Sequence, residues 1–358
     1  MNLDGPRHVH AWAPGRVNLI GDHTDYTGGL ALPMAIQLGV AIEAARVPSN
    51  SIELESDLGG ASVSEPCVVE FGAPTSGATG WARYVAAVAH EARPSIGLRG
   101  MVRSTLPAGS GLSSSAALEI AVFLALTGHQ PTSADEQLGV ALACQAAEHN
   151  ATGVPCGLLD QLAILGGRSG CATVVDALAQ TATPVPMPAG LAVWVIHSGV
   201  ARTLETSAYA QRRAECEAAE ARIGPLRLAA PADAEALSDP VLRRRARHVV
   251  SENQRVRSYV EELQRSSGPD VEALGALSVE SHRSLADDFA VSSPVLDELV
   301  DALLTQPGVT GARLTGAGFG GCVLAIGTPE LDLVEFAAAR SLPAWRMQPS
   351  AGAHVATT

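Results

Sequence analysis

The stretch Pro107-Ala108-Gly109-Ser110-Gly111-Leu112-Ser113-Ser114-Ser115-Ala116-Ala117 carries the strongest fold signal in the chain. It follows an apolar segment at 99–106, predicted to be a strand, and opens an Ala- and Leu-rich segment at 113–127, predicted to be a Ser-capped helix. Glycines let the backbone approach an anion closely, and the free N–H groups of a helix N-terminus bind phosphate with help from the helix dipole. The serine hydroxyls add donors and are suitable Mg²⁺ ligands. The sequence therefore predicts a phosphate-binding loop.

A second polar stretch runs from Gly15 to Tyr26 and reads GRVNLIGDHTDY. A guanidinium, two carboxylates, an imidazole and a phenol are gathered within it, on Arg16, Asp22, His23, Asp25 and Tyr26. Groups that both donate and accept hydrogen bonds suit a polyhydroxylated ligand. The alternative interpretation is a polar surface loop with a local Arg–Asp pair.

A third stretch, Thr315-Gly316-Ala317-Gly318-Phe319-Gly320-Gly321-Cys322, satisfies the GxGxxG pattern. A dinucleotide-binding fingerprint needs a helix after the glycines, whereas an apolar, strand-like segment at 323–326 follows here. We therefore reject a dinucleotide site and expect a glycine loop between two strands, close to a substrate or phosphate.

Two further carboxylates lie near the end of a predicted helix at 134–150. Glu148 is at the helix end, and Asp160 comes after the turn at Gly157. Such a pair could supply a Mg²⁺ ligand and a catalytic carboxylate. A zinc site built from Cys144, His149 and Cys156 lacks a recognised spacing and is not expected.

Composition excludes several other classes of protein. All 24 cationic residues among the 358 are Arg, and the absence of Lys rules out P-loop NTPases, protein kinases and Schiff-base enzymes. A net charge of −13 argues against nucleic acid and anionic membranes as partners. The N-terminus lacks a signal-peptide core, and six Cys without a CxxC pair are typical of a reduced, cytoplasmic protein.

Strands and helices are mixed without regular βαβ alternation, which predicts an α+β fold. The Pro- and Ala-rich stretch at 178–190 is the best candidate boundary, dividing the chain into domains at 1–180 and 181–358. Further strands are expected at 30–46, at 52–72 around Gly59-Gly60, at 191–197 and at 309–326. Further helices are expected at 81–92, from Thr206 to about Ile223, between there and about Leu304, and at about 330–340.

Together these segments resemble the superfamily of galactokinase, homoserine kinase, mevalonate kinase and phosphomevalonate kinase, and within it the galactokinases. The three motifs of that superfamily are matched in order by Gly15–Gly29, Leu106–Ala117 and Leu314–Gly321. Trp81 and Tyr84 resemble a Trp-x-x-Tyr near the adenine pocket, and the segment from Tyr209 to Cys216 resembles one peculiar to galactokinases. The resemblance implies a ribosomal-protein-like N-terminal domain, a ferredoxin-like C-terminal domain, and an active site in the cleft between them.

The activity implied is transfer of the γ-phosphoryl group of ATP, with Mg²⁺, to the anomeric hydroxyl of galactose, by a monomer or weak homodimer. Asp160 and Arg16 would be catalytic. The acceptor would be bound by Asp22, His23, Asp25, Gly157 and Tyr209. The nucleotide would be bound by Gly109, Ser110, Gly111, Leu112, Ser113, Ser114, Ser115, Trp81, Tyr84 and Gly318, and the metal by Ser114 and Glu148. Asp160 would act either as general base or only as an orienting group.

Three positions depart from the galactokinase pattern. Asp22 stands where the family has a Glu that reaches the C6 hydroxyl, and His197 and Arg202 also differ. The acceptor could therefore be another aldose or a sugar-like cyclitol. A non-catalytic, sugar-sensing regulator is the alternative from a different class.

Overall fold

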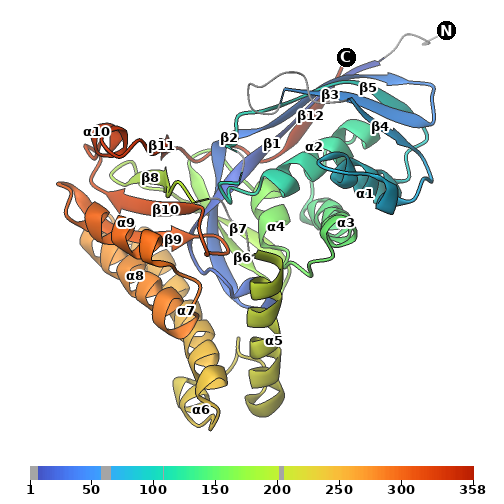
Figure 1. Ribbon diagram of the computed structural model, residues 1–358. Coiled ribbons are helices and arrows are strands. Elements are labelled where there is room, and N and C mark those ends of the chain that lie inside the picture. The colour runs from blue at the N-terminus through green and yellow to red at the C-terminus, as the bar shows by residue number, and fades with distance from the viewer. Residues whose placement is uncertain (1–6, 58–65, 108, 201–204) are drawn as a thin grey trace.

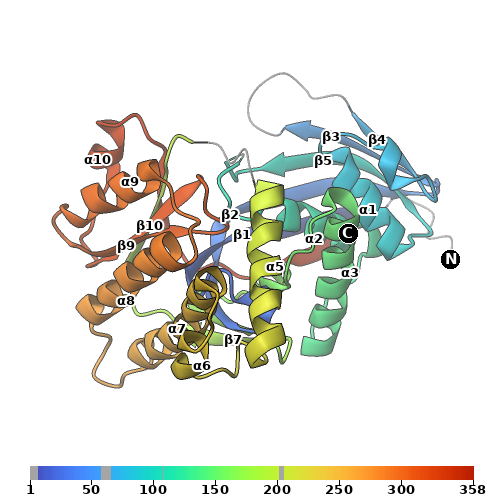
Figure 2. The ribbon, with the colours of Figure 1, turned by 60° about the horizontal axis from the view of Figure 1, so that its bottom comes forward.

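A computed structural model describes residues 7–57, 66–107, 109–200 and 205–358. Four positions considered above, Gly59, Gly60, Ala108 and Arg202, lie outside this part of the chain. Strands and helices gather into two halves, each with its own sheet, and both ribbon views place the halves beside one another (Figures 1 and 2). None of the helices in the described ranges is long and apolar enough to cross a membrane.

The first half is built on an eight-stranded sheet with a main path of β12-β1-β2-β5-β3-β4. Neighbouring strands are antiparallel except for β3 and β5, which are parallel. The strands of the first sheet are β1 (Arg7–Ile20), β2 (Leu30–Val47), β3 (Ser51–Asp57), β4 (Cys67–Glu70), β5 (Gly97–Ser104), β6 (Cys171–Asp176), β7 (Thr181–Pro186) and β12 (His354–Thr357). The helices of this half are α1 (Ala82–Ala92), α2 (Ser114–Thr127), α3 (Ala134–Thr152) and α4 (Leu159–Leu165).

The second half is built on a four-stranded antiparallel sheet of order β11-β8-β10-β9. Its strands are β8 (Ala192–His197), β9 (Val309–Thr315), β10 (Cys322–Gly327) and β11 (Ala344–Met347). Its helices are α5 (Glu205–Ile223), α6 (Pro231–Glu235), α7 (Pro240–Leu263), α8 (Val271–Arg283), α9 (Pro294–Leu304) and α10 (Val334–Ala338).

Two strands that come after the expected boundary at residue 180 belong to the sheet of the first half. The Pro- and Ala-rich stretch contains β7, which pairs with β6 of the first sheet. The C-terminal strand β12 returns to the first sheet and pairs with β1, so both ends of the described chain lie together (Figure 1). Pro184 and Pro186 are tolerated because β7 pairs only with β6 and so lies at an edge.

Helix α2 is the central helix of the first half. It packs against α1, α3, β1 and β2, and most of its residues are buried. A helix that is apolar on nearly every face must be surrounded by protein, which explains the Ala- and Leu-rich composition seen in the sequence. The Arg16 N–H of β1 donates to the Leu112 carbonyl at 3.1 Å, which fixes the predicted phosphate-binding loop, at the N-terminus of α2, beside β1.

Candidate active site

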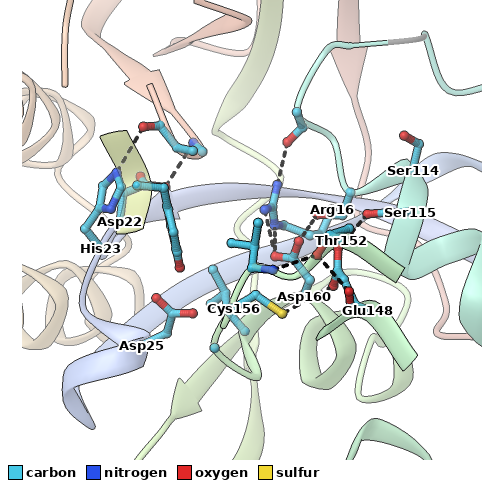
Figure 3. Close-up of a pocket in the computed structure, with 18 of the residues that line it drawn as sticks. Arg16, Asp22, His23, Asp25, Ser114, Ser115, Glu148, Thr152, Cys156 and Asp160 are labelled. Carbon is cyan, nitrogen blue, oxygen red and sulfur yellow. Dashed lines mark hydrogen bonds and ion pairs between the residues drawn. The ribbon is translucent and has the colours of Figure 1, made fainter. Parts of the chain in front are cut away.

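A cavity of about 450 Å³ lies between the loop before α2, the loop after β1, α5 and the glycine loop between β9 and β10. It brings together most of the residues predicted from the sequence. Those lining it are Arg16, Asp22, His23, Asp25, Tyr84, Gly109, Gly111, Ser113, Ser114, Ser115, Glu148, Gly157, Asp160 and Tyr209. Figure 3 shows Asp22, His23 and Asp25 on one side, Ser114, Ser115 and Glu148 on the other, and Arg16 with Asp160 between them.

Arg16 and Asp160 form the ion pair at the centre of the cavity. Nε and Nη2 of Arg16 lie 2.8 and 2.7 Å from Oδ1 of Asp160, and the Arg16 side chain is only 8 % exposed. The Ser113 hydroxyl donates to the other carboxylate oxygen at 2.6 Å. Arg16 also donates to the Gly111 carbonyl at 2.7 Å, which ties the ion pair to the predicted phosphate-binding loop.

Ser113 does not cap α2 as the sequence predicted. It occupies the N-cap position with φ of 62°, and its hydroxyl makes no capping hydrogen bond because it is directed to Asp160. Gly109 and Gly111 also have positive φ, which a residue with a side chain adopts at a cost. The loop therefore leaves the first N–H groups of α2 available to an anion.

Glu148 is the centre of a second polar group beside the ion pair. It accepts from the Ser115 hydroxyl at 2.8 Å and from the Gln161 amide at 2.9 Å. Burial, together with the nearby Asp160 charge, raises the pKa of Glu148. The serine that contacts Glu148 is Ser115, whereas Ser114 is exposed at the cavity rim. Two hard oxygen donors beside a phosphate-binding loop fit Mg²⁺, although no cluster of three metal-binding side chains occurs among the described residues.

The side of the cavity predicted to bind the acceptor, called the acceptor side below, contains Asp25, Tyr209 and Gly157. Burial is the main cause that raises the pKa of Asp25 from 3.8 to about 6, and the neighbouring Asp160 adds to it. A Cβ on Gly157 would lie 1.9 Å from Oδ2 of Asp25, so only glycine lets the backbone pass this carboxylate. The Tyr209 ring on α5 lies 5.7 Å from the His23 ring and closes this end.

His23 and Asp22 line the cavity but already have protein partners. Nε2 of His23 lies 3.1 Å from the Ala317 carbonyl, so it must donate, and Nδ1 then accepts from the Tyr26 hydroxyl at 3.1 Å. Oδ1 of Asp22 accepts from the Gly316 N–H at 2.9 Å, and Oδ2 is bound by Arg313. Both residues therefore fix the shape of the acceptor side as well as facing it.

Four predicted nucleotide-binding residues do not line the cavity. Leu112 is fully buried in the first core, Ser110 donates to the Pro107 carbonyl, and Trp81 packs against the same core. Gly318 has φ of 80° and lies against Val291, where a Cβ would approach the carbonyl to 2.3 Å. These residues instead stabilise the conformation of the segments that border the cavity. His197, one of the departures from the family pattern, also lies outside the cavity lining.

Several lining residues were not singled out from the sequence, namely Arg83, Thr152, Val154, Cys156, Leu159, Gly316 and Ala317, although the glycine loop that holds the last two was expected near a substrate or phosphate. Gly316 and Ala317 belong to the third glycine stretch, and Arg83 precedes Tyr84 and covers its ring at 4.9 Å. These three carried a positional signal. The remaining four lie between Glu148 and Asp160 in the sequence, and no local pattern indicated that this segment faces the cavity.

Comparison with known proteins identifies the family. Three family models match the chain: the galactokinase galactose-binding signature at 4–46, the GHMP kinases N terminal domain at 82–168 and the GHMP kinases C terminal domain at 258–341. Galactokinase from Homo sapiens is 42 % identical over 328 residues, covering 88 % of this chain and 82 % of the relative. Galactokinase from Thermococcus kodakarensis is 41 % identical over 324 residues, covering 89 % of each chain.

The solved structures agree with the sequence comparison. Galactokinase from Lactococcus lactis, complexed with galactose, superposes with a TM-score of 0.85 at 28 % identity, covering 97 % of this chain and 95 % of that one. Mevalonate kinase from L. major shares the fold, with a TM-score of 0.64 at 18 % identity over 95 % of this chain and 96 % of that one. The predicted superfamily and two-domain α+β fold are confirmed. The chain is a kinase of the galactokinase family.

Proposed function

We propose that this chain transfers the γ-phosphoryl group of ATP to the anomeric hydroxyl of galactose. The observation that carries the proposal is the position of Asp160, which lies between the acceptor side of the cavity and the phosphate-binding loop and is held there by Arg16 and Ser113. The galactose in the Lactococcus lactis complex and the identity to galactokinases support this acceptor.

Phosphoryl transfer depends on alignment and on neutralising the charge of the phosphate oxygens. The N–H groups at the start of α2 and the Arg16 guanidinium would supply positive potential on the phosphate side. Glu148 and the neighbouring serines would hold Mg²⁺, which supplies further charge neutralisation when bound. Ser115 is the serine placed against Glu148, so we assign the hydroxyl ligand to Ser115 in preference to Ser114.

Asp160 would receive the hydrogen bond of the reacting hydroxyl. Its two oxygens each accept from one protein residue, Arg16 on Oδ1 and Ser113 on Oδ2, and a carboxylate oxygen can accept more than one hydrogen bond. Further acceptor positions therefore remain for a sugar hydroxyl. In this arrangement Asp160 orients the hydroxyl and takes its proton as the phosphoryl group arrives.

The acceptor is tested with a panel of galactose, other aldoses and cyclitols in a coupled assay for ADP. We expect turnover with galactose, and Asp160→Asn to lose at least about a hundredfold in kcat because its amide cannot take the proton. Turnover only with another polyol would refute galactose as the acceptor. Binding without ADP release would indicate a regulator, and near-normal turnover in folded Asp160→Asn would remove Asp160 from the mechanism.

A further inference from the structure

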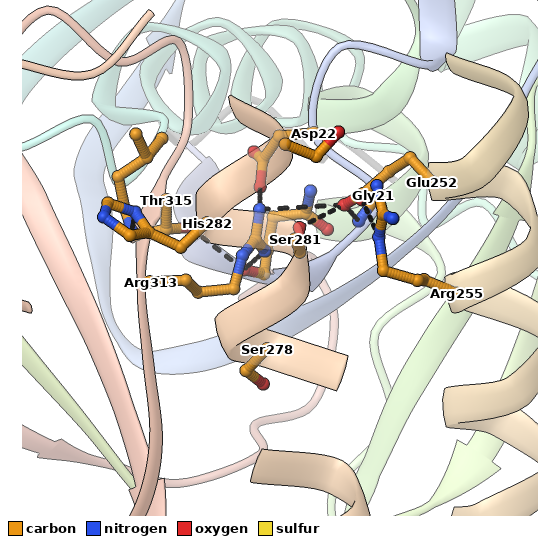
Figure 4. A network of polar contacts seen from close by, with 12 residues as sticks. Gly21, Asp22, Glu252, Arg255, Ser278, Ser281, His282, Arg313 and Thr315 are labelled. Carbon is orange, nitrogen blue, oxygen red and sulfur yellow. Dashed lines mark hydrogen bonds and ion pairs between the residues drawn. The ribbon is translucent and has the colours of Figure 1, made fainter. Parts of the chain in front are cut away.

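A buried polar cluster joins the acceptor side of the cavity to the second half of the molecule (Figure 4). We call it the interdomain clamp, and it consists of Asp22, Glu252, Arg255, Ser281 and Arg313. Asp22 follows β1 of the first half, whereas the other four residues lie on α7, α8 and β9 of the second half. Arg313 and Glu252 are both fully buried.

Arg313 is the centre of the clamp. It binds Oδ2 of Asp22, donates from Nη1 to the Leu19 carbonyl at 2.9 Å, and places Nη2 3.9 Å from Oε1 of Glu252. Glu252 in turn accepts from the Gly21 N–H at 2.9 Å and pairs with Arg255 at 2.7 Å. Two carboxylates are thus balanced by two guanidiniums in a largely buried region, where an uncompensated charge is costly.

The pKa values of the groups on α7 agree with this balance. Burial would raise the pKa of Glu252, but the charges of Arg255 and Arg313, and that of His248 once it is protonated at low pH, outweigh it and hold the pKa at about 2. Burial lowers the pKa of His248 to about 3, so this histidine is neutral at neutral pH. Its Nε2 then donates to the Asp22 carbonyl at 3.1 Å, and its Nδ1 accepts from the Ser284 hydroxyl at 2.9 Å.

The loop that carries Asp22, His23 and Asp25 is therefore held mainly from the second half. Besides Arg313, Glu252 and His248, its contacts from the second half include the Gly316 N–H on Asp22 and the Ala317 carbonyl on His23, and Asn253 accepts from the Leu30 N–H where β2 begins. The catalytic and phosphate side is held within the first half, through the contacts of Arg16, Ser113 and Ser115 with Asp160 and Glu148. The two sides of the cavity thus have separate supports.

We propose that Arg313 is a positioning residue that sets acceptor binding by fixing the Asp22 carboxylate between the two halves. Arg313 donates a hydrogen bond to Oδ2 of Asp22, and the Gly316 N–H donates one to Oδ1. The carboxylate is therefore held in one orientation toward the cavity, and it can contact a ligand there only by accepting hydrogen bonds. The proposal rests on the proposed sugar kinase function and deepens it. It predicts that loss of Arg313 weakens the acceptor much more than the nucleotide.

The test compares Arg313→Met with wild type in steady-state kinetics, with galactose and ATP varied separately, and in calorimetric binding of galactose alone. We expect the galactose KM and the galactose Kd to rise about tenfold or more, the size expected for loss of a charge-assisted hydrogen bond, while the ATP KM changes less than about threefold. Arg313→Lys keeps the charge but cannot reach Asp22 and the Leu19 carbonyl together, so we expect an intermediate rise.

A double-variant comparison separates positioning from general destabilisation. If Arg313 acts through Asp22, the double variant Asp22→Asn/Arg313→Met binds galactose no more weakly than whichever single variant has the higher galactose Kd. Arg227→Met is the control for loss of an Arg–Asp pair, because Arg227 pairs with Asp176 at 2.9 Å, in a more exposed position than the Arg313 pair, and lies outside the cavity lining. We expect its two KM values to stay close to those of wild type.

The outcomes distinguish this inference from the proposed function. Wild type that turns over another acceptor but not galactose refutes the galactose assignment, and the same variants are then measured with that acceptor. Equal rises in both KM values for Arg313→Met, or additive effects in the double variant, refute the positioning role. If Arg313→Met does not fold, Arg313→Lys is subject to the same criteria, and wild type that phosphorylates no acceptor refutes both proposals.

Discussion

Asp25 is expected to reduce the stability of the fold while serving the acceptor. Its half-buried carboxyl has a pKa raised from 3.8 to about 6, mainly by burial and further by Asp160, so the ionised form is disfavoured in the folded chain. A rise of that size corresponds to about 3 kcal/mol at neutral pH, at about 1.4 kcal/mol for each tenfold change in the proton equilibrium. We therefore predict that Asp25→Asn stabilises the protein and impairs its activity.

The magnitude converts into a measurable shift in Tm. An unfolding entropy of about 2.1 cal/mol/K per residue gives a chain of this length about 0.75 kcal/mol/K, so about 3 kcal/mol raises Tm by about 4 °C. The sign with pH follows from linkage. Because the pKa in the folded state is the higher one, stability from this group is fully present below pH 3.8 and is lost as the pH rises through about 6.

The assay is thermal unfolding of wild type and Asp25→Asn at pH 5 and pH 8, with galactose phosphorylation measured alongside. We expect the gain in Tm to be about twice as large at pH 8, where the wild-type carboxyl is ionised. We also expect kcat/KM for galactose to fall about 10- to 100-fold, as for loss of a charged hydrogen-bond acceptor. Glu330→Gln is the control, because this glutamate is exposed and lies outside the cavity lining.

Two results would refute this reasoning. A lower Tm for Asp25→Asn would mean that the carboxylate makes a net stabilising contact. A gain that does not grow between pH 5 and pH 8 would mean that the ionised form carries no penalty. Unchanged turnover of galactose would separately remove Asp25 from acceptor binding.

Two further substitutions test the packing around the cavity. Gly157→Ala places a Cβ 1.9 Å from Oδ2 of Asp25 and should raise the galactose KM at least about tenfold. Gly77→Ala, which has open space around it, is the control and should leave the kinetics unchanged. Equal KM values in the two variants would contradict a close approach at Gly157. Glu119 is fully buried, and its oxygens have no hydrogen-bond partner within the described residues. Burial raises the pKa of this carboxyl well above the usual range, and we expect it to be neutral. In thermal unfolding, Glu119→Gln should therefore change stability by less than about 1 kcal/mol, and a much larger loss would show that the carboxyl is ionised and paired.

Much of the fold was predictable from local patterns. The helix at 81–92 and the strand at 30–46 are confirmed within a residue or two, because apolar periodicity and turn residues act over short distances. The stretch at 178–190 shows the limit of this reasoning. Its prolines indicate a linker, yet β7 forms there because an edge position needs no donor on one side.

By itself, the sequence determined which chemical groups the site contains: the glycine and serine loop, the Asp- and His-bearing loop, Glu148 and Asp160. Their types and spacing are properties of the chain. The tertiary structure decided which atoms meet. It directs Ser113 to Asp160 instead of the helix end, places Ser115 against Glu148, and pairs Asp22 with Arg313 across 291 residues. Contacts between such distant positions depend on how the two sheets and their helices pack, and no local pattern in the sequence encodes that packing.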